Sequence, residues 1–228
     1  MNPYQQPSVA TADSALATNK LIRNTYSLLS MTLLFTAVMA GVAMVLQVSP
    51  MVSLLCSGGA LILLWFVLPR TANSAAGLGV VFGITGLLGF GLGPVLSMYL
   101  GLPNGPQVVM AAFGLTGLVF IGLSGYALTT KKDFSFMGGM LFAGILVAFL
   151  ASIGLLIAGM FGVNVSGFAL GISALFAFLM CGLILFQTSQ IVNGGETNYI
   201  MATIGLYVAI YNLFTSLLHL LGAFMGEE

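Results

Sequence analysis

Charged side chains are almost missing from this chain: five Lys or Arg and five Asp or Glu make up 4% of its 228 residues. Soluble domains carry about 25% charged residues, so this is not the sequence of an ordinary soluble domain. The hydrophobic share is 59% and the mean hydropathy is +1.13, which is typical of an integral membrane protein. One helical crossing takes roughly 20 apolar residues. The chain therefore holds several spans and leaves no room for a soluble catalytic domain.

Residues that could bind metals or carry out catalysis are also scarce. His219 is the single histidine, and Cys56 and Cys181 both lie within apolar runs, where a thiol behaves as a small hydrophobe. No pair of His, Cys, Asp or Glu residues has metal-ligand spacing, and no G-x-S-x-G, Walker or H-E-x-x-H motif occurs. We therefore predict no catalytic residue, no metal site and no cofactor, and we expect that the protein is not an enzyme.

Seven apolar runs follow a polar amino-terminal segment. Residues 1–24 are rich in Ser, Thr, Asn and Gln, and we expect them to form a disordered cytoplasmic tail. The apolar runs lie at residues 25–48, 51–68, 75–100, 108–129, 137–161, 167–186 and 199–224. They are continuous and long, whereas a β-barrel would show short segments of alternating polarity. The sequence thus predicts an all-α integral membrane protein, with residues 25–228 forming one domain of seven transmembrane helices.

The basic residues predict the orientation of these helices in the membrane. Lys20 and Arg23 precede the first run, Arg70 follows the second, and Lys131 and Lys132 follow the fourth, so all five fall on one side. The opposite loops, at residues 49–50, 101–107 and 162–166, carry no charge. Lys and Arg near span ends resist translocation. We therefore expect a multi-pass bacterial inner-membrane protein with a cytoplasmic amino terminus and a periplasmic carboxyl terminus.

The last apolar run carries polar residues on one side. At 100° per residue, six of them fall within one half of the helix circumference: Tyr207, Tyr211, Asn212, Thr215, Ser216 and His219. Polar groups within a bilayer need partners, so this helix is expected to pack inside the bundle or to line a wet cavity. The six residues are candidates for a polar interior or for the path of an ion or solute. Hydrogen bonding between helices is the favoured alternative, because uncharged polar residues commonly serve packing.

The stretch LFQTSQIVNGGETNYI, residues 185–200, is polar for a chain with so little charge. We predict that its polar residues finish the sixth helix at the cytoplasmic surface and that its two glycines form a tight turn. Residues 196–198 are expected to cap the seventh helix. For Glu196, the favoured role is that of a solvated loop carboxylate near the start of a helix, where a negative charge costs nothing electrostatically. The same cytoplasmic surface is a candidate for binding partners through Lys131, Lys132, Asp133 and Glu196.

Five segments carry a family resemblance: RNTYSLLSMTL (23–33), GLGPVLSMYL (91–100), LTTKKDFSFMGG (128–139), FQTSQIVNGGETNYI (186–200) and LYVAIYNLF (206–214). Together they resemble the Bax inhibitor-1 family, in its bacterial YccA branch, over nearly the whole chain. The resemblance implies a fold of seven helices in which the last helix is surrounded by the other six. This expectation agrees with the polar side of the last apolar run.

The resemblance also implies two functions. Members of the YccA type are substrates and modulators of the membrane AAA protease FtsH, which grips their amino-terminal tail. The FtsH regulators HflK and HflC are further expected partners, as is the lipid bilayer, whereas nucleic acid is not expected. Other family members are described as calcium leak channels, in which a pair of aspartates on the last two helices opens the channel in response to pH.

The aspartate positions of those channels match Gln187 and Ala209 in this sequence. Two carboxylates can share a proton and switch when it is released, but glutamine and alanine cannot ionise. The pH switch is therefore predicted to be absent. Because acids that could conduct a cation are mostly missing, we favour an interaction protein that modulates FtsH over a calcium or other cation leak channel.

Overall fold

The computed structural model describes the backbone of residues 6–225 and the side chains of residues 16–225, and these residues form helices and no strand. The α-helices are α1 (Gln6–Val45), α2 (Pro50–Ile62), α3 (Leu68–Thr71), α4 (Ala75–Leu100), α5 (Gly105–Thr130), α6 (Gly138–Met160), α7 (Ser166–Val192) and α8 (Tyr199–Met225). A π-helical segment, Leu63–Val67, joins α2 to α3, and a short 3-10 turn, Ser135–Met137, precedes α6. Seven helical stretches within the described residues are long and apolar enough to cross a membrane. The predicted fold class is confirmed.

Two helix boundaries differ from the prediction. The first helix begins at Gln6 instead of residue 25, because no Gly or Pro lies between residues 8 and 40 to stop it, and Pro7 stands in the first turn, where proline is tolerated. The sixth span, α7, continues to Val192 instead of residue 186. Its polar residues stay helical because they find hydrogen-bond partners in a neighbouring loop.

The second span is also less regular than the single helix that its apolar run predicts. Residues Leu63–Val67 form a π-helical turn that ends two residues before Pro69. Proline has no N–H to donate and its ring crowds the preceding turn of an α-helix. A π-bulge is one of the ordinary ways in which a helix accommodates such a site. The span therefore crosses as α2, the π turn and α3 in succession.

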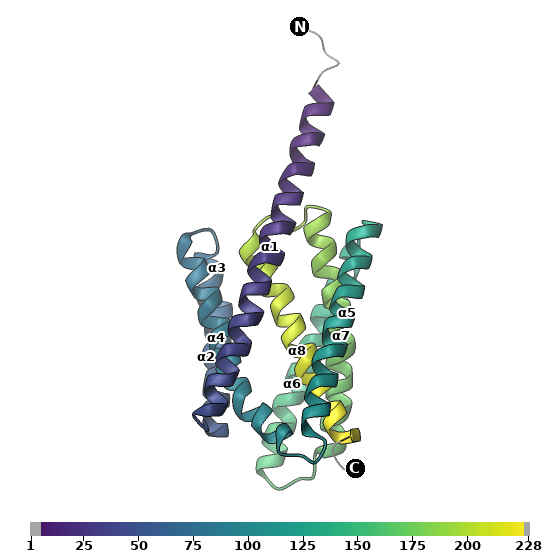
Figure 1. Ribbon diagram of the computed structural model, residues 1–228. Helices are drawn as coiled ribbons and strands as arrows, with labels where there is room; N and C mark the ends of the chain where they lie inside the picture. Colours follow the sequence, from purple (N-terminus) through teal and green to yellow (C-terminus); the bar gives the residue numbers. More distant parts are fainter. Residues whose placement is uncertain (1–5, 226–228) are drawn as a thin grey trace.

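The last helix lies between two groups of helices. In one group α1 and α2 each pack on α4, and in the other α5 and α6 each pack on α7. α8 packs directly on α1 and α4 from the first group and on α5 and α7 from the second. It is visible between α1 and α5 in Figure 1. The last helix therefore lies between the two groups as expected, but among the described residues it packs closely on four of the other six spans instead of all six, because α2 packs on α4 and α6 packs on α7.

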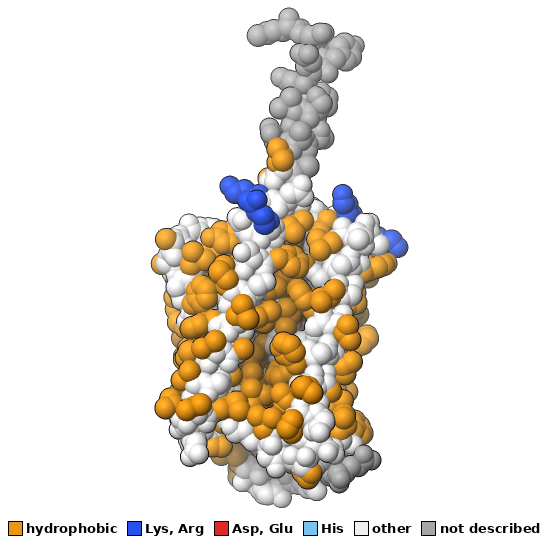
Figure 2. All heavy atoms as spheres, viewed as in Figure 1, with side chains coloured by type: hydrophobic (Ala, Val, Ile, Leu, Met, Phe, Trp, Pro, Cys, Tyr) orange, Lys and Arg blue, Asp and Glu red, His pale blue; other side chains and the backbone are white. Residues whose placement is uncertain are grey.

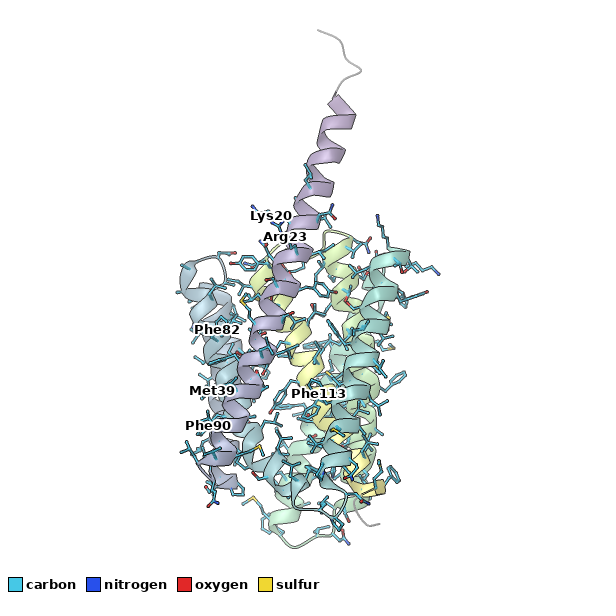
Figure 3. The ribbon with its side chains drawn as sticks, viewed as in Figure 1. Lys20, Arg23, Met39, Phe82, Phe90 and Phe113 are labelled. Atoms are coloured by element: carbon cyan, nitrogen blue, oxygen red, sulfur yellow. The ribbon has the colours of Figure 1, made fainter. Side chains whose placement is uncertain are left out.

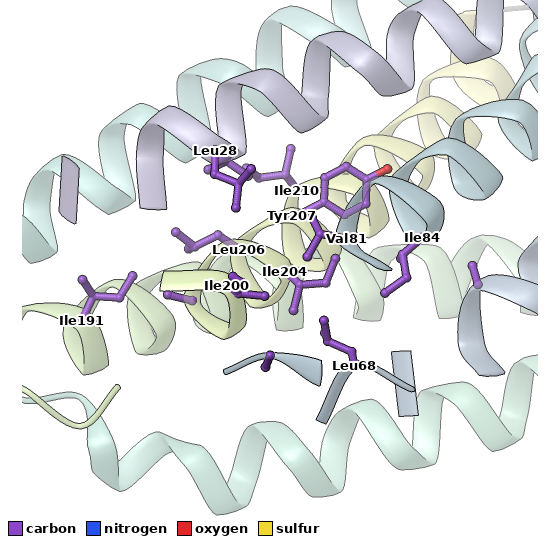
Figure 4. Close-up of a cluster of buried hydrophobic side chains, with 14 residues drawn as sticks. Leu28, Leu68, Val81, Ile84, Ile191, Ile200, Ile204, Leu206, Tyr207 and Ile210 are labelled. Atoms are coloured by element: carbon purple, nitrogen blue, oxygen red, sulfur yellow. The ribbon is translucent and has the colours of Figure 1, made fainter. Parts of the chain in front are cut away.

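Small residues allow the first group to pack closely. A Cβ added at Gly89 of α4 would lie 2.5 Å from the backbone oxygen of Thr36 on α1, and a Cβ added at Gly93 would lie 2.5 Å from Ala43 Cβ. Small residues at such positions let helix backbones approach within the membrane. The core is completed by α8, whose side chains Ile204, Leu206, Tyr207 and Ile210 point among those of α1 and α4 in Figure 4.

The two ends of the bundle differ in charge. The body of the face shown in Figure 2 is covered by apolar side chains, and the visible basic side chains gather at the end where α1 leaves the bundle. Lys20 and Arg23 lie on α1 at this end (Figure 3), and the last residue of α8 lies at the opposite end (Figure 1). The basic residues thus share one end of the bundle. That this end faces the cytoplasm stays a prediction.

Candidate functional site

The first part of the polar side of α8 holds helices together. Tyr207 is fully buried, and its hydroxyl lies 2.8 Å from Thr36 Oγ1. Thr36 Oγ1 can itself donate to the carbonyls of Thr32 (2.9 Å) and Thr85 (3.1 Å), so it accepts the proton of Tyr207. The Tyr211 hydroxyl donates to the Leu88 carbonyl at 3.3 Å. For these two tyrosines the structure favours hydrogen bonding between helices over a solute path.

The second part of the polar side lines a cleft. Its volume is about 320 Å³, and its walls are residues of α6, α7 and α8. The four polar residues of α8 in this cleft are the predicted Asn212, Thr215, Ser216 and His219. Ser152 of α6 and Ser173 of α7 face them, and Ser173 Oγ lies 2.7 Å from His219 Nδ1. We call these six polar residues and the space between them the α8 cleft.

The α8 cleft lies within the membrane-spanning part of α8, in the half that leads to the carboxyl terminus. His219 precedes Met225 by six residues and Asn212 precedes it by thirteen, which correspond to about 9 Å and about 20 Å along a helix axis. The cleft thus extends from near one end of the bundle toward the middle of the helix. It contains no charged carboxylate, Lys or Arg.

The two positions that match the family's aspartates lie beyond the cleft, toward the other end of α8. Ala209 is fully buried in an apolar cluster with Leu141, Ile184 and Leu213. Gln187 on α7 is half-buried, and its amide packs against Gly205, where an added Cβ would lie 2.8 Å from the amide carbon. Gly205 precedes Ala209 by one turn of α8. Neither position carries a group that titrates near neutral pH.

The polar residues 188–190 of α7 form hydrogen bonds with the end of α5 and with the loop between α5 and α6. Thr188 Oγ1 lies 3.2 Å from Ser124 Oγ on α5. The next residue, Ser189, accepts the Phe134 N–H at 2.9 Å and donates to the Lys132 carbonyl at 3.1 Å. Gln190 Nε2 donates to Ser135 Oγ at 2.8 Å. These bonds account for a polar sequence at the end of a span in a chain with so little charge.

The two acids at this end of the bundle shape their own loops. The Asp133 carboxylate accepts the hydroxyl of Ser135 and its N–H, and these bonds hold the pKa of this carboxyl below its usual range. Glu196 Oε1 accepts the N–H groups of Thr197 and Asn198, each at 2.8 Å. Lys131 and Lys132 are exposed, and Lys131 ends α5 in the left-handed region at φ 51°. The four predicted surface residues thus lie in two loops at one end of the bundle.

The turn before α8 has the form that the sequence predicts. Gly194 has φ 78°, a left-handed conformation that glycine adopts readily. Asn198 Oδ1 accepts the N–H of Ile200 at 2.8 Å and thereby caps α8. Its Nδ2 also donates to Asn73 Oδ1 at 2.7 Å and to the Ala72 carbonyl at 3.0 Å. This side chain connects the start of the last helix to the loop between α3 and α4, a contact that the sequence did not reveal.

A comparison with protein families matches residues 18–226 to the family described as Inhibitor of apoptosis-promoting Bax1. The chain belongs to this family. The match includes every span and therefore confirms the resemblance drawn from the five sequence segments.

Bacterial relatives resemble the chain over most of its length. It is 46% identical to the Modulator of FtsH protease YccA of Escherichia coli K12 over 209 residues, 92% of each chain. It is also 46% identical to an uncharacterized membrane protein of Vibrio cholerae over 228 residues, the full length of both. An Escherichia coli O6:H1 relative with the same identity is named Inner membrane protein YccA. Together with the seven apolar helices, these relatives support a multi-pass protein of the inner membrane.

Proposed function

We propose that this protein binds and modulates the membrane AAA protease FtsH and is itself one of its substrates. The observation that carries the proposal is the 46% identity, over 92% of both chains, to a protein named for modulating this protease. The matched relatives are named as a modulator or as membrane proteins, and we propose no catalytic role for this chain.

Two structural features support the proposal. α1 projects past the other helices in Figure 1, at the end of the bundle where the visible basic residues gather in Figure 2, so the protease can reach this helix without unfolding the bundle. The loops that carry Lys132 and Glu196 are held by hydrogen bonds that Ser189 donates to the Lys132 carbonyl and that the Asn198 N–H donates to the Glu196 carboxylate. They present a defined surface beside that helix. FtsH, or its regulators HflK and HflC, would bind there.

Co-isolation tests this binding. FtsH should be retained by the full-length protein in detergent and should be lost when Lys131 and Lys132 are both changed to Gln. Arg70→Gln is the matched control, because it removes a basic charge at the same end of the bundle from a different loop. Equal retention by the double variant and the control would remove the loop from the proposed binding surface.

The proposed orientation places the amino terminus in the cytoplasm and the carboxyl terminus in the periplasm. It rests on the gathering of Lys and Arg at one end of the bundle. A reporter that is active only in the periplasm should be active when fused after Glu228 and inactive when fused near Arg70. The reverse pattern would place the basic end outside and refute the orientation.

A cation leak, calcium included, is the second candidate function, and the α8 cleft favours it, because polar groups there reach from one end toward the middle of α8. Buried Ala209 and Tyr207 separate the cleft from the opposite end. Calcium flux into liposomes that contain the purified protein tests this candidate. Since Gln187 and Ala209 do not titrate, any flux should depend little on pH between mildly acidic and neutral conditions unless the imidazole of His219 in the cleft takes their place. A steep pH response that survives His219→Ala would contradict this prediction.

A further inference from the structure

The hydrogen bonds of the α8 cleft leave it rich in acceptors. Ser152 Oγ donates to the Ala148 carbonyl at 2.8 Å, and Thr215 Oγ1 donates to the Tyr211 and Asn212 carbonyls at 3.1 Å. Each hydroxyl has one proton, so both offer the cleft only their lone pairs. Asn212 Nδ2 donates to the Val208 carbonyl at 2.8 Å, and no described residue donates to its Oδ1. Three oxygen acceptors thus face one space, which is also lined by the Ser216 hydroxyl, for which no hydrogen bond to a described residue is found.

The residues around the cleft determine which kind of hydrogen-bond donor can bind to these acceptors. No charged side chain lines it, and Leu155, Ile172 and Phe176 supply apolar walls. Thr215 lies ten residues before Met225, about 15 Å along the helix and hence well inside a bilayer core that is about 30 Å thick. Neutral side chains with hydroxyl or amide groups reach this depth when they are carried by a transmembrane helix.

The packing of α6 leaves the side of the cleft open. Among the described spans, α6 packs its backbone closely against α7 alone, and it does not approach α8 in this way. Only 11% of the most apolar 18-residue stretch of this span is buried inside the protein. The cleft therefore lies between α6 and α8 as an open furrow, with α7 forming part of its wall. A further helix can approach along α6 without displacing another span.

We propose that the α8 cleft receives the hydrogen-bond-donating side chains of a transmembrane helix that belongs to a partner protein. This inference rests on the proposed function, in which the chain binds the membrane protease FtsH. Amide or hydroxyl donors of the partner helix bond to Asn212 Oδ1, Thr215 Oγ1 and Ser152 Oγ. A partner helix without donor side chains at this depth gives no hydrogen bond to these three acceptors. The cleft therefore favours partner helices that carry a polar residue at the depth of the cleft in the bilayer.

A pair of synthetic helices tests the proposal. One is a transmembrane peptide of leucine and alanine with a single Asn placed in the same half of the bilayer as the cleft, and the other has Leu at that position. Energy transfer between labelled peptide and labelled full-length protein in liposomes measures binding. The Asn peptide should bind about tenfold more tightly, as two or so interhelical hydrogen bonds would give. A third peptide, with Asn in the opposite half, should bind like the Leu peptide.

Two variants test whether the preference for the Asn peptide over the Leu peptide depends on residues of the cleft. Thr215→Val and the milder Ser152→Ala should each reduce the preference for the Asn peptide by several-fold. Thr129→Val is the matched control, since Thr129 also bonds back to its own helix, at the Gly125 carbonyl, but lies outside the cleft. Equal binding of the Asn and Leu peptides would overturn the proposal, and so would a preference that survives both cleft variants.

The test separates this inference from the function on which it rests. If the peptides show no preference while FtsH is still retained by the full-length protein, the cleft has another role and the proposed function stands. A calcium flux that Thr215→Val abolishes, without any peptide preference, would overturn the docking site and assign the cleft to the leak channel.

Discussion

The hydroxyl of Tyr207 on the last helix lies 2.8 Å from Thr36 Oγ1 on the first, at a point where Tyr207 is fully buried. Tyr207→Phe removes this bond and keeps the ring. Thr36 still has two carbonyls to bond, so no buried proton is left unpaired. The variant should lose about 1 kcal/mol of stability, measured as the free energy of unfolding in detergent. Tyr211→Phe, which removes the longer bond to Leu88 at 3.3 Å, should lose less. A loss of the same size or larger at Tyr211 would contradict this ranking.

Ser189→Ala should release the loop between α5 and α6. The change removes the acceptor of the Phe134 N–H and the donor to the Lys132 carbonyl together. Amide hydrogen exchange at residues 132–135 should therefore become faster, while exchange in α4 stays unchanged. Ser57→Ala is a suitable control, because Ser57 bonds only to the Ser53 carbonyl of its own helix. Unchanged exchange in the loop would mean that the polar run does not hold it.

Gly89→Ala should separate α1 from α4. The added methyl group would lie 2.5 Å from the Thr36 carbonyl oxygen, and a backbone atom cannot move away as a flexible side chain can. We expect a loss of about 1–3 kcal/mol in unfolding free energy. The control is Gly114→Ala on α5, where nothing lies within 4 Å and helix propensity should give a small gain. Similar stabilities for the two variants would argue against close packing at Gly89.

The Asp133 carboxyl should titrate below the ordinary Asp pKa of about 3.9, because the hydroxyl and N–H of Ser135 donate to its charged form. Its folded-state pKa is lowered, so these bonds support the loop above the ordinary pKa and are lost only as the pH falls through the lowered value. Carboxyl carbon NMR of the protein in detergent measures this titration. Ser135→Ala should raise the pKa toward the ordinary range, and an unchanged titration would refute the assignment.

The sequence predicts the spans well because long apolar runs in a chain with 4% charge have one structural solution, the transmembrane helix. It also places the polar residues of α8 on one side, since 100° per residue puts Tyr207 and His219 there. It does not predict that Leu206 and Leu213, on the opposite side, are buried as well. The capping of α8 by Asn198 follows from local residue types in the same way.

What the sequence does not predict depends on contacts between distant residues. Ser152 and Ser173 are single serines within apolar runs, so nothing in their own segments marks them as partners of the polar side of α8. The division of that polar side into a tyrosine part bonded to α1 and α4 and a part that lines a cleft depends on which helices pack on α8. The change from polar to apolar residues predicts a helix start at residue 25, whereas the absence of Gly and Pro from residues 8–40 lets α1 extend back to Gln6.

The lifetime of the protein in cells with and without active FtsH tests the central claim most directly. A variant that lacks residues 2–19 but keeps Lys20 and Arg23 removes the proposed handle and preserves the charges that orient α1. In a pulse-chase experiment the full-length protein should disappear faster with active FtsH than without it, and the shortened variant should be long-lived in both. Other membrane substrates of the protease should then be degraded more slowly. Equal lifetimes of the full-length and shortened proteins in the presence of active FtsH would contradict the account.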